Sequence, residues 1–445
     1  MSDAGMSPSR RTLLRGIAGG AGLAAAGGLL TACGSSGSSS SKPSTGGSSG
    51  SAGGGAVTFG SNYSDPGVKS AFAALTAAAT AATGSQIKIN TVDHNTFQTN
   101  ITSYLQGTPD DLFTWFAGYR MQYFAAQGLA LPIDDVWEKI GGNFGPAAKA
   151  LSTGLDGHQY LVPLYNYPWV VFYSKSLFKA KGYTVPTTWD QYLALAKKMK
   201  ADGIIPIAFA DKDGWPALGT FDILNMRING YDYHIKLMKH EIPWTDQGVT
   251  NVFQHWAEIL PYMQSGANGR IWQDAAKALE AKQAGMMFQG TNQVAAQFVT
   301  DKADLADLDF FVYPEINPTY GTDYMDAPTD GFMLSKKAKN VDAAKKVLEF
   351  IGTGSTEALF LKTDQWDVGL ANGLSVPTYD AIQTKSVTEI GKCKAVAQFM
   401  DRDADPAMAT AMIAIIQQFI DNPSTSKIAA LQKSAEDQAK AIYTS

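Results

Sequence analysis

Apolar residues recur along the chain with two alternating periods, one typical of short strands and the other of amphipathic helices. Val68 and Phe72 lie at helical spacing, and Pro66 before them predicts the first turn of that helix. In order, this part of the chain predicts strand 56–59, helix 66–83, strand 86–92, helix 96–106, strand 111–116 and helix 121–127. Strands and helices that alternate at these lengths indicate an α/β lobe around a largely parallel sheet.

The same alternation begins again later in the chain. The expected elements there are strand 170–173, helix 189–202, strand 204–210 and two further helices at 341–351 and 407–420. Thr188 and Gln191 are spaced as a capping box at the start of the helix that Gly203 ends. Met286 and Met287 are assigned to core packing. The sequence therefore predicts two α/β lobes.

The N-terminal segment has the composition of a bacterial export signal. Arg10 and Arg11 precede an apolar run that is too short for a membrane span, and small residues precede Cys33. The paired arginines resemble the twin-arginine export motif, and residues 30–33 resemble the lipobox of bacterial lipoproteins, whose cysteine receives a diacylglycerol. We therefore expect a signal peptide at 1–32 and a mature protein that is lipid-anchored through Cys33 at the extracytoplasmic face of the cell membrane.

Composition limits what the rest of the chain can be. Residues 33–55 consist of Cys33 and a segment of mostly Gly and Ser, which behaves as a flexible tether. The remainder of the 445-residue chain is too long for one small core. The formal net charge of −5 gives no sign of nucleic-acid binding. Cys393 is the only cysteine after Cys33, which excludes an intramolecular disulfide in the mature chain.

Four stretches of the folded part resemble, in order and spacing, family 1 of the extracellular solute-binding proteins, the maltose-binding-protein-like receptors of carbohydrate ABC importers. They are residues 109–115 with 126–134, residues 157–163 with 172–175, residues 186–191 with 203–207, and residues 331–336 with the helix that follows. Together these stretches extend the resemblance over nearly all of residues 56–445. The order of the four stretches carries more weight than any one of them.

The resemblance implies the two-lobed periplasmic-binding-protein fold, an α/β architecture in which hinge crossings join the lobes and the ligand binds in the cleft between them. It implies a first lobe from residues 56–164 and 316–372, and a second from residues 165–315 and 373–445. It also implies a monomer that captures a mono- or oligosaccharide and delivers it to ABC permease subunits in the membrane. Neither a cofactor nor a metal is expected.

A sugar needs planar polar side chains around its hydroxyls and an aromatic platform against its C–H face. In α/β sheets, such groups lie on loops at the carboxyl ends of the strands. The candidate ligand-binding residues at these positions are Asn62, Asp65, His94, Phe116, Tyr119, Arg120, Tyr165, Asn166, Tyr167, Trp169, Asp213, Trp215, Asn292, Asp330 and Trp366. Trp215 is the expected platform of the second lobe, whereas Asn292 stands where the family often has a Trp. Asp65 is equally well explained as a helix cap, and His94 as a loop histidine.

Enzymatic function is not expected, because the sequence has no Gly-rich phosphate loop, no paired histidines at zinc-helix spacing and no nucleophile elbow. A secreted glycosidase, which needs only two carboxylates in a cleft, is the weaker alternative. The stronger alternative is a binding protein of the same fold for a polyamine or for ferric iron. In that case Tyr165 and Tyr167 would form a tyrosine pair.

Residues 401–405 begin like a calcium-binding loop. However, Pro406 stands where that loop requires Gly, and Met412 stands where it requires the closing Glu. We therefore interpret this segment as the start of a helix, with Asp401 or Arg402 as a further candidate for the cleft.

Overall fold

The computed structural model describes residues 56–374 and 379–443. The predictions made for the N-terminal segment lie outside these residues and concern the signal peptide at 1–32, Arg10, Arg11, Cys33 and the tether at 33–55. Within the two described ranges, no helix is both long and apolar enough to cross a membrane.

The first lobe is built on a five-stranded mixed sheet with the strand order β2-β1-β3-β10-β4. Strands β1, β2 and β3 are parallel, whereas β10 runs antiparallel to both β3 and β4. The strands are β1 (Val57–Ser61), β2 (Ile87–Thr91), β3 (Leu112–Phe116), β4 (Leu161–Asn166) and β10 (Thr329–Leu334). The helices are α1 (Pro66–Thr83), α2 (His94–Gln106), α3 (Tyr119–Ala126), α4 (Asp134–Ile140), α5 (Pro146–Leu151), α13 (Val341–Ile351) and α14 (Gly354–Thr363), with the 3-10 turn η1 (Gly141–Asn143).

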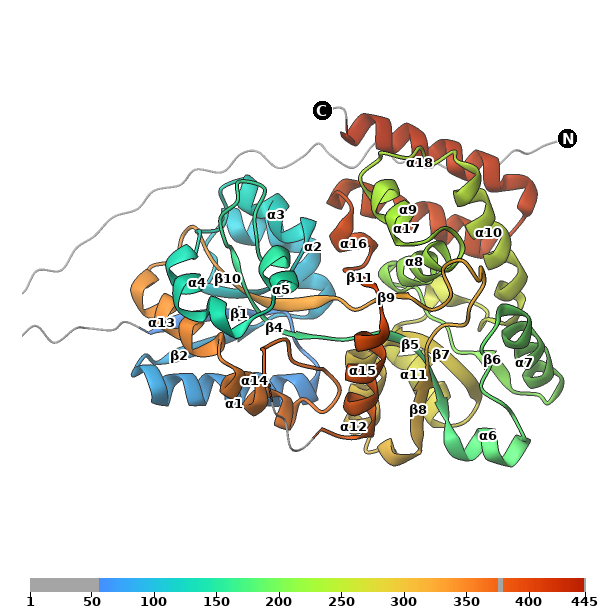
Figure 1. The fold of residues 1–445 in the computed structure, drawn as a ribbon, viewed down its shortest axis with the longest axis horizontal. Helices are drawn as coiled ribbons and strands as arrows, with labels where there is room; N and C mark the ends of the chain where they lie inside the picture. Colours follow the sequence, from blue (N-terminus) through green and yellow to red (C-terminus); the bar gives the residue numbers. More distant parts are fainter. Residues whose placement is uncertain (1–55, 375–378, 444–445) are drawn as a thin grey trace, which may run out of the picture. The chain divides into compact units, whose positions relative to one another are not determined.

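The second lobe has a four-stranded sheet with the order β6-β7-β5-β8, in which β5 is antiparallel to both neighbours. Its strands are β5 (Trp169–Ser174), β6 (Ile205–Ile207), β7 (Ala284–Gly290) and β8 (Leu308–Phe311). Its helices before the last crossing are α6 (Lys175–Lys181), α7 (Trp189–Ala201), α8 (Trp215–Asn229), α9 (Tyr231–Met238), α10 (Gln247–Ile259), α11 (Trp272–Glu280) and α12 (Thr291–Thr300), with 3-10 turns η2 (Leu260–Tyr262), η3 (Ala267–Gly269) and η4 (Leu305–Asp307). Figure 1 shows the two lobes, each a sheet with its own helices, and the strands that cross from one lobe to the other.

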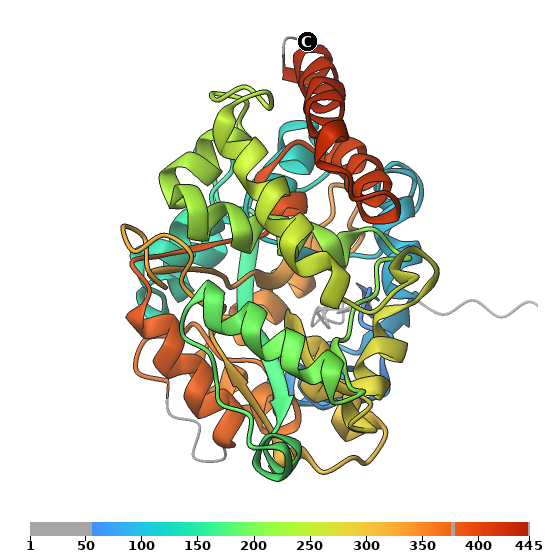
Figure 2. The same cartoon turned by 90° about the vertical axis from the view of Figure 1, so that its right-hand side faces the viewer.

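Three segments pass between the lobes. The first joins β4 to β5 through Tyr167 and Pro168, and the second carries the chain from β8 through β9 (Tyr324–Asp326) to β10. The third includes α15 (Ala381–Lys392) and β11 (Ala395–Ala397), and β11 pairs in parallel with β9. After it come α16 (Met400–Asp403), α17 (Pro406–Asp421), η5 (Thr425–Lys427) and α18 (Ile428–Tyr443). In Figure 2, α17 and α18 (red) lie beside helices of the second lobe, and α17 contacts α8 while α18 contacts α10.

Most predicted elements are confirmed, and the differences have local causes. The predicted strand 204–210 is paired only over Ile205–Ile207, because its edge then turns away from β7 into the loop before α8. The Thr188 capping box is half formed: the Thr188 side chain accepts from the Gln191 backbone, but Gln191 Oε1 accepts from Thr187 N at 2.9 Å. Met286 and Met287 lie in the core as predicted.

Candidate functional site

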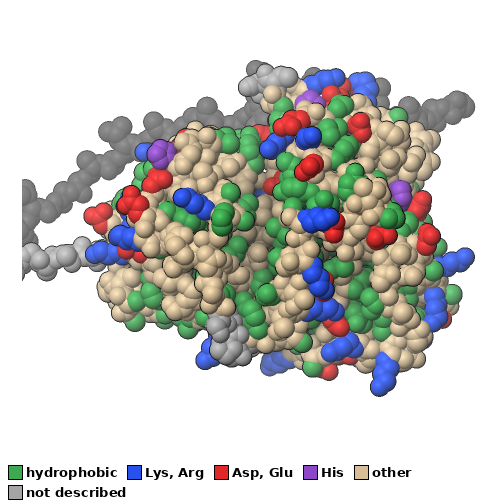
Figure 3. Space-filling view, in the orientation of Figure 1, with side chains coloured by type: hydrophobic (Ala, Val, Ile, Leu, Met, Phe, Trp, Pro, Cys, Tyr) green, Lys and Arg blue, Asp and Glu red, His purple; other side chains and the backbone are tan. Residues whose placement is uncertain are grey.

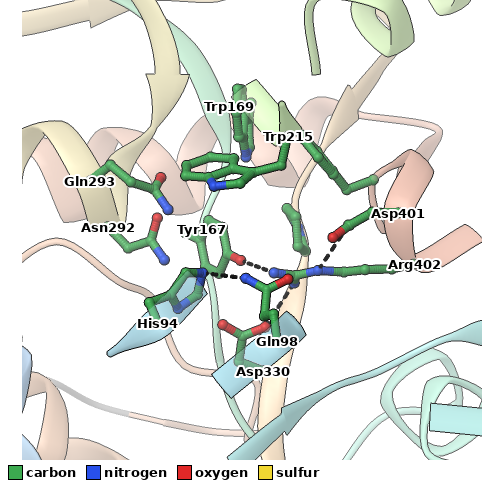
Figure 4. A pocket seen from close by; sticks show the side chains of 12 residues that line it. His94, Gln98, Tyr167, Trp169, Trp215, Asn292, Gln293, Asp330, Asp401 and Arg402 are labelled. Atoms are coloured by element: carbon green, nitrogen blue, oxygen red, sulfur yellow. Dashed lines mark hydrogen bonds and ion pairs between the residues drawn. The ribbon is translucent and has the colours of Figure 1, made fainter. Parts of the chain in front are cut away.

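A small chamber lies where the crossing segments meet the first and second lobes (Figure 4). Its empty volume, with the open solvent at its mouth included, is about 370 Å³. The residues that line it are His94, Gln98, Tyr167, Trp169, Trp215, Asn292, Gln293, Pro328, Asp330, Phe399, Asp401 and Arg402. Side chains of the first lobe, the second lobe and the crossings therefore share one space, which we call the central chamber.

Three helices begin at the central chamber. His94 is the first residue of α2, Trp215 is the first residue of α8, and Asn292 lies in the first turn of α12. Each of these helices follows a strand, so the chamber lies at the carboxyl ends of β2, β6 and β7. This arrangement directs backbone N–H groups and the positive ends of the helix dipoles toward the ligand space.

Arg402 is the fixed cation of the central chamber. Its Nη1 donates to Asp330 Oδ1 at 2.7 Å, and its Nη2 donates to the Tyr167 hydroxyl at 2.6 Å. Its guanidinium carbon lies 3.9 Å from the centroid of the Phe116 ring, within cation–π range. Burial alone would lower the pKa of Arg402, but the attraction of Asp330, Tyr167 and Asp401 outweighs it and leaves the pKa above its ordinary value.

Asp330 owes its position to an irregularity of β10. The pairing of β10 with β4 shifts register between Asp330 and Gly331, as in a β-bulge. A Cβ at Gly331 would lie 2.2 Å from the Val162 carbonyl oxygen, so only glycine allows this close approach of the two strands. The carboxyl of Asp330 is buried and also accepts from the hydroxyls of Tyr63 and Tyr165.

His94 presents a neutral imidazole to the chamber. Its Nε2 lies 2.6 Å from Gln98 Nε2, and its Nδ1 lies 3.3 Å from Asn62 Nδ2. Burial, together with the neighbouring charge of Arg402, lowers the pKa of His94 to about 4. At neutral pH the ring is therefore an uncharged hydrogen-bonding group fixed by two amide side chains.

Aromatic rings form one wall of the chamber. The rings of Trp169 and Trp215 lie 6.1 Å apart at an interplanar angle of 85°, and Trp169 also contacts Phe399 at 4.8 Å. Trp215 Nε1 donates to Asn95 Oδ1 at 3.3 Å, which ties the second lobe to the first. Two perpendicular indoles next to polar groups suit a ligand with one apolar face.

Several buried polar atoms of the chamber side chains have no hydrogen-bond partner among the residues that the structure describes. These atoms are Trp169 Nε1, Asn292 Oδ1, Gln293 Oε1, Asp401 Oδ1 and Arg402 Nε. A buried donor or acceptor without a partner costs about 1–3 kcal/mol. Figure 4 shows the amides of Asn292 and Gln293 on one side of the space, opposite Asp401 and Arg402. Donors and acceptors on both sides would be satisfied together by one small ligand with several hydroxyls.

Two further spaces adjoin the central chamber. A second chamber with an empty volume of about 680 Å³ shares His94, Trp215, Asn292 and Gln293 with it. An outer groove of about 1,350 Å³ lies on the other side and shares Gln98, Trp215 and Asp401. On the face of the molecule shown in Figure 3, basic and acidic side chains are interspersed and no field of one sign forms.

Arg120 lies between the central chamber and the outer groove. Its Nη1 donates to Asp401 Oδ2 at 2.7 Å and to Gln98 Oε1 at 2.9 Å. Burial lowers the pKa of Arg120, although Asp401 opposes this shift. Arg120 therefore connects α2 and α3 of the first lobe to α16 and holds one oxygen of Asp401, while the other oxygen lies 3.6 Å from Arg402 Nε.

The structure brings many of the predicted site residues together. His94, Tyr167, Trp169, Trp215, Asn292 and Asp330 line the central chamber. Asp65, Tyr165 and Trp366 line the second chamber, whereas Arg120 and Asp213 line the outer groove. Their contact with a ligand stays a prediction.

Four predicted site residues, Asn62, Phe116, Tyr119 and Asn166, line none of these three spaces. Asn62 is fully buried and bonds Thr114 as well as approaching His94, so it supports a lining residue from behind. Phe116 also supports a lining residue from behind, because its ring packs against the guanidinium of Arg402. As contacts of a ligand, these four residues also stay predictions.

Sequence reasoning missed Gln98, Gln293 and Phe399. Gln98 follows His94 by one helical turn on α2, so helical spacing could have found it. Gln293 is adjacent to the predicted Asn292. Phe399 gave no comparable signal, because its place in the chamber depends on the third crossing segment.

The family profile of the bacterial extracellular solute-binding proteins matches residues 65–353 of the chain. Among solved structures, the chain is similar to the bacterial solute receptor AcbH, with a TM-score of 0.86 and 70% sequence identity. That match covers 88% of this chain and 100% of the receptor, whose reported substrate preference is exclusively β-D-galactopyranose. A chitin oligosaccharide binding protein has the same fold at 21% identity, with a TM-score of 0.76 over 87% of this chain and 100% of its own.

Two further relatives are less similar in sequence. An uncharacterized ABC transporter extracellular-binding protein of Pyrococcus horikoshii, PH1214, is 27% identical over 329 residues, which are 73% of this chain and 72% of the relative. The alpha-glucosides-binding periplasmic protein AglE of Rhizobium meliloti is 27% identical over 296 residues, covering 61% of this chain and 63% of its own.

Proposed function

Because the chain belongs to the family of bacterial extracellular solute-binding proteins, we propose that it is the receptor of a sugar ABC importer and binds β-D-galactopyranose. Proteins of this family bind and deliver solutes and are not enzymes. The identity of 70% with a receptor for β-D-galactopyranose supports this sugar over the other members of its class.

The observation that carries the proposal is the set of unpartnered polar atoms in a chamber with an aromatic wall. Asp401 Oδ1 and Arg402 Nε lie 3.6 Å apart, so one sugar hydroxyl can donate to the carboxylate and accept from the guanidinium. The amides of Asn292 and Gln293 form hydrogen bonds with hydroxyls on the opposite edge of the sugar. The indoles of Trp169 and Trp215 then cover the C–H face.

Binding in this chamber couples the ligand to closure of the lobes. Its lining comes from α2 of the first lobe, from α8 and α12 of the second, and from the crossing segments. A sugar can therefore make all of its contacts only when the lobes are closed. A ligand shifts the balance between open and closed forms only by its greater affinity for the closed form. The closed receptor is the form that the permease subunits recognise.

The N-terminal motifs support a location of the protein at the extracytoplasmic face of the cell membrane. The protein is exported through its paired Arg10 and Arg11, cleaved after residue 32 and anchored by a diacylglycerol on Cys33. The Gly/Ser tether leaves the folded part free to reach the permease as a monomer. Replacement of Cys33 by Ser should release the protein from the membrane fraction, and retention of the C33S variant there would overturn lipid anchoring.

The extents of the two lobes are likewise part of the proposal. Residues 56–164 with 316–372 form the first lobe, and residues 165–315 with 373–445 form the second. The positions of the two sheets support this division, because β10 returns to the first sheet after β8 ends the second.

A polyamine or ferric ion fits the central chamber less well than a sugar does. Either cation would lie next to the guanidinium of Arg402, whose charge is fixed. The Tyr167 hydroxyl is engaged by Arg402, and Tyr165 stacks on Phe360 at 5.4 Å, so neither tyrosine is placed as a free metal ligand.

Thermal unfolding of the lipid-free C33S protein tests the proposal against a panel of D-galactose, D-glucose, lactose, maltose, spermidine and ferric citrate. A ligand that binds only the folded state raises the melting temperature by mass action. We expect D-galactose to give the largest shift. A larger shift with spermidine or ferric citrate, or none with any sugar, would contradict the proposal.

A further inference from the structure

Phe399, in the wall of the central chamber, has a backbone conformation that L-residues rarely adopt. Its φ is 95° and its ψ is 144°. Residues other than glycine remain in such a region only when the surrounding structure holds them there, and they cluster at ligand sites and clamps. The other described non-glycine residues with positive φ, His240, Lys282 and Lys302, have φ values of 56–57°, in the ordinary left-handed region.

The side chain of Phe399 explains why a glycine cannot stand at this position. The ring is 3% exposed and packs 4.8 Å from the ring of Trp169 in the aromatic wall. Both rings lie over Gly219 of α8, where a Cβ would come within 2.6 Å of Phe399 Cε2 and 2.7 Å of Trp169 Cζ3. The ring is therefore required by the chamber although the backbone is strained.

Two carboxyls hold the chain on either side of Phe399. The backbone N–H of Gln398 donates to Asp403 Oδ2 at 2.9 Å. The backbone N–H of Met400 donates to Asp222 Oδ2 at 2.6 Å, and Asp222 is fully buried on α8. The Phe399 carbonyl accepts from Arg402 N and Asp403 N, each at 2.9 Å. We call residues 398–403 the binding segment.

The binding segment delivers two of the chamber's polar groups. Asp401 and Arg402 follow the strained residue by two and three positions. Their atoms Oδ1 and Nε lie 3.6 Å apart, and neither makes a hydrogen bond with the residues that the structure describes. The direction in which these atoms point depends on the turn that Phe399 makes. If the N–H of Met400 lost its acceptor, the segment would relax toward an ordinary φ and both groups would turn.

We propose that Asp222 and Asp403 are positioning residues that clamp Phe399 in its strained conformation and so preorganise Asp401 and Arg402 for the ligand. This inference rests on the proposed function, since it assigns to the two carboxyls a part in the affinity for the sugar. Neither carboxyl lines the central chamber, so each acts through the binding segment.

The surroundings of Asp222 identify the variant that should preserve its role. Burial, with repulsion from Asp326, raises the pKa of Asp222 well above its ordinary value. The ring of His234 lies beside Asp222, with its Nδ1 4.0 Å from Asp222 Oδ1, and burial lowers the pKa of His234 to about 3. Asn is uncharged, as is the carboxyl form that burial favours, and it keeps an oxygen acceptor for Met400 N.

The first test compares Asp222→Asn with Asp222→Ala by calorimetric titration with D-galactose at a temperature where circular dichroism shows both variants to be folded. We expect D222N to bind within about threefold of the wild-type Kd, and D222A to bind at least about tenfold more weakly. Loss of melting temperature in D222A with an unchanged Kd would overturn the proposal, because the carboxyl would then be merely structural. Equal weakening in D222N and D222A would overturn it as well.

The second test does not require D222A to fold. Phe399→Gly and Phe399→Ala both remove the ring but differ at the strained φ, which glycine adopts without penalty. We expect F399G to have a higher melting temperature than F399A and a Kd for D-galactose at least about fivefold lower. Equal melting temperatures, or tighter binding by F399A, would show that the segment is not held in this conformation.

The two tests separate this inference from the proposed function. If the wild-type protein binds no sugar, the proposed function falls, and the order of the melting temperatures of F399G and F399A still decides whether Phe399 is clamped. If the wild type binds D-galactose and the D222N/D222A pair behaves alike, only the positioning role falls.

Discussion

Replacing Arg402 with Met removes the cation of the central chamber while keeping most of the side-chain length. Asp330 is 1% exposed and would lose the donor that now lies 2.7 Å from its Oδ1. The hydroxyls of Tyr63 and Tyr165 would still donate to it. Because breaking a buried pair leaves an uncompensated charge, we expect R402M to lose about 3–5 kcal/mol of unfolding free energy at neutral pH.

The size of this loss should depend on pH. Burial raises the pKa of Asp330, and Arg402 partly opposes that shift. Without Arg402 the folded-state pKa rises further above the unfolded value. A carboxyl with a raised folded pKa contributes stability at low pH that is lost as the pH rises through the folded pKa. The difference in stability between the wild type and R402M should therefore be larger at pH 8 than at pH 5.

The same substitution should weaken sugar binding. A hydrogen bond from a charged donor contributes about 1.5–3 kcal/mol, so its loss raises Kd by about tenfold to a hundredfold. Urea unfolding followed by tryptophan fluorescence at pH 5 and pH 8 measures the stability, and calorimetric titration with D-galactose measures the affinity. Arg402→Lys is the control, because a lysine keeps the charge but cannot reach Asp330 and Tyr167 with the fork of a guanidinium. An equal stability loss at both pH values, or an unchanged Kd in folded R402M, would refute the reasoning.

Three further predictions concern the walls of the chamber. Trp215→Ala should raise the Kd for D-galactose at least about tenfold without unfolding the protein, since Trp215 is only partly buried; an unchanged Kd would remove Trp215 from the site. Burial lowers the pKa of His94 to about 4, so the unfolded chain binds more protons than the folded one between about pH 4 and 6.5, and stability falls on acidification. His94→Gln should flatten this fall in a series of melting temperatures, and an unchanged slope would count against it. Gly219→Ala should weaken binding, because its Cβ would meet the rings of Phe399 and Trp169 within 2.7 Å; a variant that is more stable and binds as well as the wild type would contradict this.

Periodicity predicted the order of elements, because each helix and strand buries a face that its own sequence specifies. Helix 341–351 is confirmed over Val341–Ile351, where Ala344, Val347 and Leu348 recur on one buried face. The predicted strand 204–210 extends beyond β6, because apolar residues after Ile207 are buried by loop packing rather than by pairing. Local patterns do not distinguish these two kinds of burial.

Placement at strand ends was also a productive guide to the site. His94 and Trp215 follow strands and reach the central chamber, as the rule for α/β sheets predicts. The rule could not separate lining residues from those one layer behind, such as Phe116, because the two differ only in the direction of the side chain. Phe399 reaches the chamber through a third crossing that no local pattern specifies, and its positive φ has no signature in a sequence without glycine there.

We expect the chamber organised by Arg402 to bind one β-D-galactopyranose. The most direct measurement is a calorimetric titration of the lipid-free wild-type protein with D-galactose, repeated with D-glucose, which differs only at one hydroxyl. We expect one site per chain for D-galactose and a Kd for D-glucose at least about a hundredfold higher, since a misplaced hydroxyl leaves buried polar groups unpaired. No binding of D-galactose, or equal binding of the two sugars, would contradict it.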